Sequence, residues 1–121
     1  MDFFKKLFGK NTAPPIENIP AIKNIPGIEP IVVQAVESLI PDADTQKKTF
    51  ECILEFKKDR KGVADLITIL ALLKYSKGDL ALFRNSAWQS HPHFWMDEIS
   101  PIFRTMEAAE KWVKSLSESK N

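Results

Sequence analysis

The sequence has little of several residue types on which whole classes of protein depend. Its single cysteine, Cys52, cannot form an intramolecular disulfide, which suits a reducing compartment. Its four glycines leave no glycine-rich loop that could hold a phosphate group. The longest apolar run, Leu66 to Leu73, is far shorter than the roughly 20 residues that span a bilayer. A disulfide-stabilised module, a nucleotide-binding loop and a transmembrane helix are therefore not expected.

An excess of charge of one sign is also missing. Seventeen lysines and arginines stand against sixteen acidic residues, so the formal net charge is only +1. Basic residues are dense between Lys47 and Lys61, but acidic residues alternate with them at helical spacing. We interpret this stretch as a solvated helix face and expect no nucleic-acid partner, because no aromatic platform accompanies the charges.

Proline and isoleucine dominate the first quarter of the chain. Five of the eight prolines lie within the first 30 residues, and proline favours extended backbone in its neighbourhood. Isoleucines recur there at every third position: Ile16, Ile19, Ile22, Ile25 and Ile28. Three residues make one turn of a polyproline II helix, so these side chains should line one edge of an extended arm. We assign residues 1–28 to an amphipathic N-terminal segment with this arm, and residues 29–121 to a single helical domain.

From Glu29 onward, apolar residues recur at the spacing of one helix face. This spacing predicts helices at 30–40, at 42–58, at 63–77 and from Thr105 onward, and the third of these is apolar on most sides. On the second helix, Leu54 and Phe50 belong to the stripe that we expect to be buried. The sequence thus predicts a mainly α fold, a compact bundle of four to six short helices with a proline-rich N-terminal arm.

Residues 79–104 leave two interpretations open. Asp79 can cap a helix that runs to Gln89, and Pro92 suits the start of another. The apolar run that follows Asp79 is equally compatible with a short strand, because periodicity does not decide brief apolar runs. The alternative is therefore an α+β fold with one short β-hairpin formed by residues 80–85 and 101–104.

The segment from Ser90 to Glu98 holds the residues best suited to chemistry. A hydrolase or metal-binding site built on His91, His93, Asp97 and Glu98 is the enzymatic alternative, since imidazoles and carboxylates transfer protons and bind metals. The spacing disfavours it, because residues two apart on a helix point away from each other. We expect no cofactor and no metal here, and we interpret Cys52 as a small buried residue of a helix.

Binding is the function that the remaining features favour. Trp88 and Trp95 are candidate anchors, because tryptophan is over-represented in interface hot spots. The candidate contacts on the arm are Phe3, Phe4, Phe8, Ile19 and Ile25. We expect a small, soluble, cytoplasmic protein of bacterial type, not an enzyme, that binds another macromolecule as an adaptor, chaperone, inhibitor or immunity-type partner, or that forms a homodimer.

Three placements of the N-terminal segment stay open. Residues 2–10 could lie on a membrane surface with their phenylalanines buried, although stable anchoring normally needs a second signal. The arm could instead fold back on its own domain, or it could be exchanged between subunits or laid into a groove on a partner.

Overall fold

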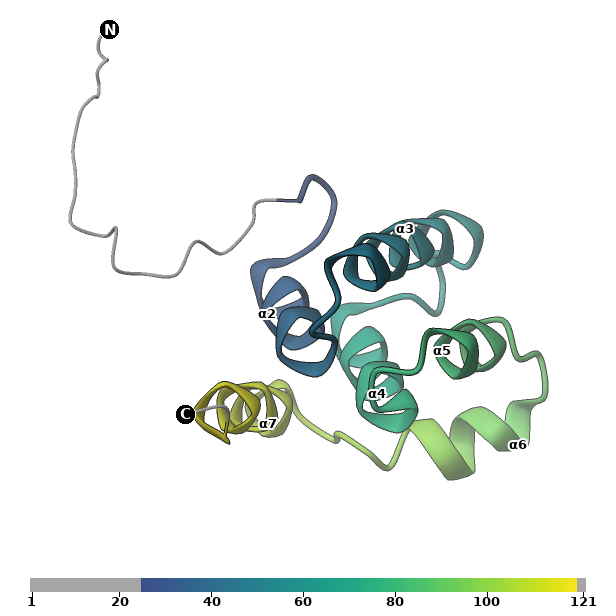
Figure 1. Cartoon of the computed structure of the whole chain (residues 1–121). Coiled ribbons are helices and arrows are strands. Elements are labelled where there is room, and N and C mark those ends of the chain that lie inside the picture. The colour runs from purple at the N-terminus through teal and green to yellow at the C-terminus, as the bar shows by residue number, and fades with distance from the viewer. Residues whose placement is uncertain (1–24, 120–121) are drawn as a thin grey trace, which may run out of the picture.

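The computed structural model describes residues 25–119, which form a bundle of helices (Figure 1). In chain order its elements are α2 (Pro30–Leu39), α3 (Ala43–Asp59), α4 (Leu66–Ser76), α5 (Leu80–Ala87), α6 (Pro92–Phe94), the π-helical turn η2 (Trp95–Ile99) and α7 (Met106–Ser119). No strand occurs within the described range. The predicted mainly α fold is confirmed.

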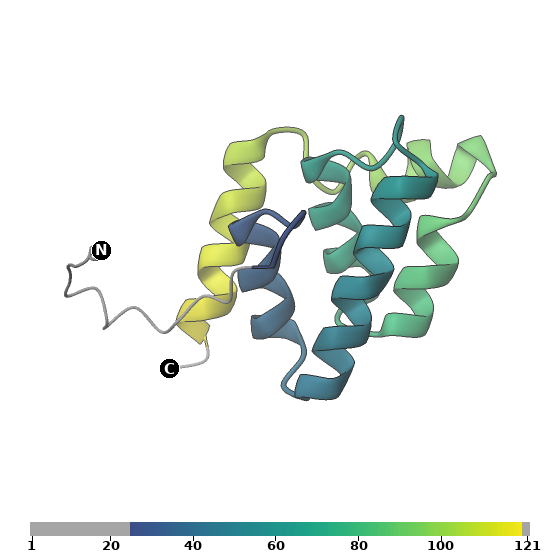
Figure 2. The same cartoon turned by 90° about the horizontal axis from the view of Figure 1, so that it is seen from above.

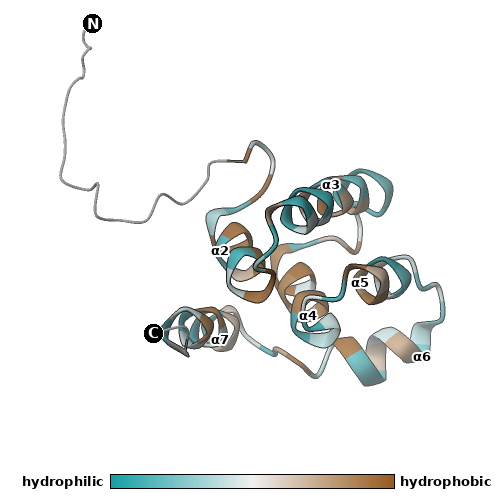
Figure 3. Ribbon diagram, viewed as in Figure 1, coloured by the Kyte–Doolittle hydropathy of each residue, from teal (hydrophilic) through white to brown (hydrophobic). Residues whose placement is uncertain are grey.

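Helix α4 lies in the middle of the bundle and packs against α2, α5, α7 and η2 (Figures 1 and 2). Five consecutive residues of α4, from Ile69 to Leu73, are almost completely buried. A helix surrounded by others must be apolar on most sides, and α4 is largely brown in Figure 3, whereas the outward side of α3 is teal. The sequence-based expectation of an apolar central helix is thus confirmed.

Aspartates begin three of the helices. Asp42 accepts a hydrogen bond from the Thr45 amide at 2.8 Å, Asp65 accepts from the Thr68 amide at 3.0 Å, and Asp79 accepts from the Leu82 amide at 3.1 Å. Each bond satisfies an amide of the first turn that has no partner inside the helix. These caps explain why the chain turns into helix at α3, α4 and α5.

The β-hairpin alternative is wrong. Residues 80–85 belong to α5, and residues 101–104 form turns and a bend. The cap at Asp79 starts a helix in which Phe83 and Ala87, four residues apart, are buried together, while Leu82 is exposed. Burial of one helix face therefore decides the structure of a run whose sequence was compatible with a strand.

Two details of the helices differ from the sequence-based expectation. Helix α4 begins at Leu66, because Asp65 is its cap and the Val63 amide donates to the Arg60 carbonyl in a preceding turn. Leu54 was expected to be buried but is 38% exposed, whereas Phe50 and Phe56 on the same helix are buried. Leu54 lies just outside the face of α3 that packs against the bundle, so its side chain is at the edge of a surface groove.

Candidate binding surface

One of the predicted anchors, Trp95, binds a backbone carbonyl next in sequence to the other, Trp88. The Trp95 indole Nε1 donates to the Gln89 carbonyl at 2.6 Å, and Arg60 Nη1 donates to the same oxygen at 3.3 Å. Gln89 directly follows Trp88, the C-cap residue of α5. Through Arg60 and Trp95, its carbonyl therefore connects the end of α5 to the end of α3 and to the start of η2. We call Arg60, Arg84, Trp88 and Trp95 the Trp–Arg surface.

An arginine lies over each of the two indole rings. Arg60 Cζ is 5.9 Å from the ring centroid of Trp95, and Arg84 Cζ is 5.8 Å from that of Trp88. At these distances a guanidinium is attracted by the ring quadrupole. Arg84 also lies 3.4 Å from Glu55, but both side chains are more than half exposed, so this ion pair contributes little to stability.

The two indoles are held by rings beneath and beside them. Trp88 contacts Phe56, which is fully buried, with ring centroids 5.7 Å apart. Trp95 contacts Phe94 at 5.7 Å, and Phe94 in turn meets Tyr75 edge-on at 5.6 Å. Both indoles are half-buried, so part of each ring is exposed to solvent.

A shallow pocket adjoins Trp95. It has a volume of about 130 Å³, and its lining combines apolar side chains, among them Trp95 and Phe103, with the polar residues Thr68 and Ser100. Met96, the residue after Trp95, is 66% exposed and adds apolar area to this side of the molecule. Trp95 is thus both a member of the Trp–Arg surface and part of the lining of this pocket.

Of the four residues of the enzymatic alternative, the structure brings together only the two histidines, whose rings meet edge-on with centroids 5.4 Å apart although the spacing suggested that they point away from each other. His91, His93, Asp97 and Glu98 are all exposed. His91 Nδ1 accepts a hydrogen bond from the His93 amide at 3.2 Å, so this lone pair is used to cap α6. Between residues 25 and 119, no group of three or more histidine, cysteine, aspartate or glutamate side chains could hold a metal ion. The geometry therefore offers no support for a hydrolase or metal centre on these residues.

Cys52 is fully buried in α3, as its sequence context predicted. Burial raises the pKa of its thiol, an effect that Arg84 opposes and Glu55 reinforces. A thiol with a raised pKa is protonated at neutral pH and is a poor nucleophile. Its place in the core accounts for Cys52 without any catalytic role.

A second apolar surface follows the outer side of α3. We call it the α3 groove; its volume is about 380 Å³ and its lining consists of Ile25, Ala43, Lys47, Phe50, Glu51 and Leu54. Ile25 is half-buried and packs against the core. Sequence reasoning missed this groove, because Leu54 follows Phe50 by four residues and was therefore assigned to the buried stripe of α3.

The segment in front of α2 is attached to α3 close to the groove. Lys57 Nζ lies 2.8 Å from both the Gly27 carbonyl oxygen and Glu29 Oε1. Partial burial opposes ionisation of Glu29, but the hydrogen bond and the charge of Lys57 outweigh it and lower the pKa of the carboxyl group. Gly27 has a φ of +83°, and a Cβ there would lie 3.0 Å from Leu54 Cδ2, so glycine permits the close approach.

The other predicted contacts, Phe3, Phe4, Phe8 and Ile19, lie outside the described residues. So does segment 2–10, for which a membrane surface was the alternative. Within residues 25–119, no helix has both the length and the apolarity that crossing a bilayer requires.

Comparison with known proteins adds no relative to this picture. No protein-family model matches the chain, and neither the curated proteins nor the solved structures contain a match.

Proposed function

We propose that this chain is a non-enzymatic binding domain that captures another protein through the Trp–Arg surface. The observation that supports the proposal is the junction at the Gln89 carbonyl, where Trp95 and Arg60 are bound beside Trp88. Tryptophan and arginine are the residues most enriched in interface hot spots, and side chains that are already ordered lose less entropy on binding. An adaptor, chaperone, inhibitor or immunity-type role in a bacterial cytoplasm belongs to the same proposal.

The chemistry of the surface indicates the kind of partner that would fit. The pocket beside Trp95 would accept an aliphatic or aromatic side chain. Among the described residues, Arg60 forms no ion pair, and its single hydrogen bond to Gln89 leaves further N–H donors for a carboxylate. A protein segment with one apolar anchor next to an acidic residue therefore matches both features, and a second copy of this chain is the homodimeric variant of the same idea.

The arm supplies the second part of the proposed contact. Phe3, Phe4 and Phe8 are apolar enough to enter a groove on a partner, in the manner of an amphipathic helix. Removal of residues 1–24 is the appropriate truncation for testing them, because Ile25 packs against the core and Ile28 is buried.

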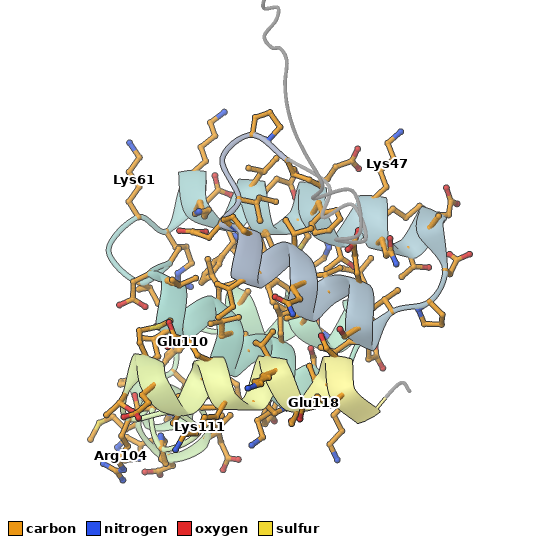
Figure 4. All side chains as sticks on the ribbon, turned by 90° about the vertical axis from the view of Figure 1, so that its left-hand side faces the viewer. Lys47, Lys61, Arg104, Glu110, Lys111 and Glu118 are labelled. Atoms are coloured by element: carbon orange, nitrogen blue, oxygen red, sulfur yellow. The ribbon has the colours of Figure 1, made fainter. Side chains whose placement is uncertain are left out.

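Affinity capture with the tagged full chain tests the proposal. We expect proteins enriched by the wild type to be lost with Arg60→Glu and with Trp95→Ala, because these changes remove the cation and the ring that meet at Gln89. Arg104→Glu is the matched control, since it reverses the charge of an exposed arginine outside the Trp–Arg surface. Arg104 lies just before α7, and the charged residues labelled on that helix, among them Glu110 and Lys111, are of mixed sign (Figure 4).

Two results would contradict the proposal. One is that the tagged wild type enriches no protein above the tag alone and is monomeric by light scattering. The other is that the enriched proteins are retained equally by wild type, Arg60→Glu and Trp95→Ala, with all three chains folded by circular dichroism.

A further inference from the structure

The α3 groove runs along the axis of its helix. The five groove residues that α3 contributes lie at the spacing of one helix face: Ala43, Lys47, Phe50, Glu51 and Leu54. From Ala43 to Leu54 the helix rises 1.5 Å per residue, so the groove is about 16 Å long. Its polar and charged groups come from Lys47 and Glu51, and Lys47 extends away from the domain into solvent (Figure 4). An extended peptide with apolar side chains along one edge would fit a surface of this length and composition.

The N-terminal end of the described chain, at Ile25, lies at this groove. Gly27 lies against Leu54, at the end of the groove nearest to Lys57, and Ile25 already lines the groove. The first described residues lie beside α3 on the side of α2 in both views of the ribbon (Figures 1 and 2). The described part of the chain therefore begins at the open groove.

The sequence before Ile25 matches the dimensions of the groove. Ile19, Ile22 and Ile25 are spaced by three residues, so in a polyproline II helix they would share one edge. At 3.1 Å per residue, such a helix from Ile19 to Ile25 would span about 19 Å, close to the length of the groove. Lys23, two residues before Ile25, carries a charge opposite to that of Glu51 on the rim.

We propose that residues 19–24 lie in the α3 groove of their own domain, where Ile19 and Ile22 continue the row that Ile25 begins. A directly attached segment reaches the groove at a high effective concentration, so a separate peptide or a second copy competes at a disadvantage. The inference goes beyond the proposed function and does not depend on it, since the Trp–Arg surface is formed by other residues.

Thermal unfolding of the full chain gives the first test. Ile22→Asp places a charge on the edge that faces the groove, and we expect it to lower Tm by about 5 °C, as loss of one well-buried aliphatic contact does in a domain of this size. Ala21→Asp is the matched control, because it adds the same charge one residue away from that edge, and it should shift Tm by less than about 1 °C. Equal Tm values for Ile22→Asp and Ala21→Asp would overturn the proposal.

An engineered disulfide gives the second test and identifies the occupant. In the full chain, Ile22→Cys combined with Lys47→Cys should oxidise to a disulfide within one chain, seen as a monomer on a non-reducing gel and confirmed by peptide mapping. Ile22→Cys combined with Lys111→Cys, on the exposed side of α7, is the matched control and should remain reduced. Cys52 is buried and is not expected to take part.

Each possible result of the oxidation experiment either supports or overturns the proposal. A disulfide within one chain supports the proposal. A disulfide-linked dimer would show that the groove receives the arm of a second copy, and no disulfide at the groove would leave it to a separate partner; both results overturn the proposal. Neither result bears on capture through Arg60 and Trp95, so failure of this inference is distinguishable from failure of the proposed function.

Discussion

Lys57 and Glu29 connect the last turns of α3 to the start of α2 through an ion pair of 2.8 Å between residues 28 positions apart. The same ammonium group binds the Gly27 carbonyl, so one side chain holds the segment that leads from the α3 groove into α2. Hydrogen bonds that join distant parts of a chain in this way order the segment between them. Stability should therefore depend on the ionisation of Glu29.

The first prediction concerns pH. Because Lys57 holds the pKa of Glu29 below its ordinary value of 4.5, the ionised form is favoured in the folded state. The resulting stabilisation is present above pH 4.5 and is lost as the pH falls through the lower folded-state pKa. Glu29→Gln should therefore be less stable than wild type at pH 7, and the difference in urea midpoint should shrink toward pH 3.

The matched control for this experiment is Glu118→Gln, on the exposed side of α7 (Figure 4). It should give the same urea midpoint as wild type at both pH values. A Glu29→Gln difference that is constant from pH 7 to pH 3 would show that Glu29 contributes by packing and not by charge.

The second prediction tests the cap of the central helix. Asp65→Ala removes the acceptor of the Thr68 amide and should lower the free energy of unfolding by about 1 kcal/mol. Asp65→Asn keeps an acceptor at the same position and should retain most of the stability. Chemical denaturation of both variants measures the difference, and equal losses for alanine and asparagine would argue against the cap as the cause.

The third prediction compares two glycines. Gly78 has a φ of +86°, and a Cβ there would lie 3.0 Å from the Leu39 carbonyl oxygen, so Gly78→Ala should destabilise by roughly 1 to 2 kcal/mol. Gly62 has no atom within 4 Å of a built Cβ and no positive φ, so Gly62→Ala should be neutral or stabilise by up to about 1 kcal/mol. Thermal melts of the two variants side by side provide the measurement.

The fourth prediction concerns two apolar residues that lie two positions apart on α3. Phe56 is fully buried and supports Trp88, so Phe56→Ala should cost about 3 to 5 kcal/mol and change tryptophan fluorescence. Leu54 is 38% exposed, so Leu54→Ala should cost less than half as much. Similar losses for the two variants would mean that the edge of the α3 groove is as tightly packed as the core.

The local features of the fold followed from the sequence alone. The apolar spacing of α2, α3 and α7 and the cap at Thr105 involve residues at most four positions apart. Such interactions form in the same way wherever the helix is placed. Periodicity over longer segments therefore predicted most helices and the apolar character of α4. Periodicity did not determine the secondary structure of residues 80–85, because a short apolar run is compatible with both a strand and a helix until the elements that pack against it are known.

Only the tertiary structure decided which apolar and aromatic side chains reach the surface. Leu54 shares a helix with Phe50, yet the neighbouring helices cover Phe50 and leave Leu54 at the groove. Likewise, Trp95 and Arg60 meet at the Gln89 carbonyl because the ends of α3 and α5 lie close to the start of η2. A sequence specifies local hydrogen bonds and the apolar face of each helix. The exposure of that face depends on which distant helix packs against it, and therefore on the arrangement of the whole bundle.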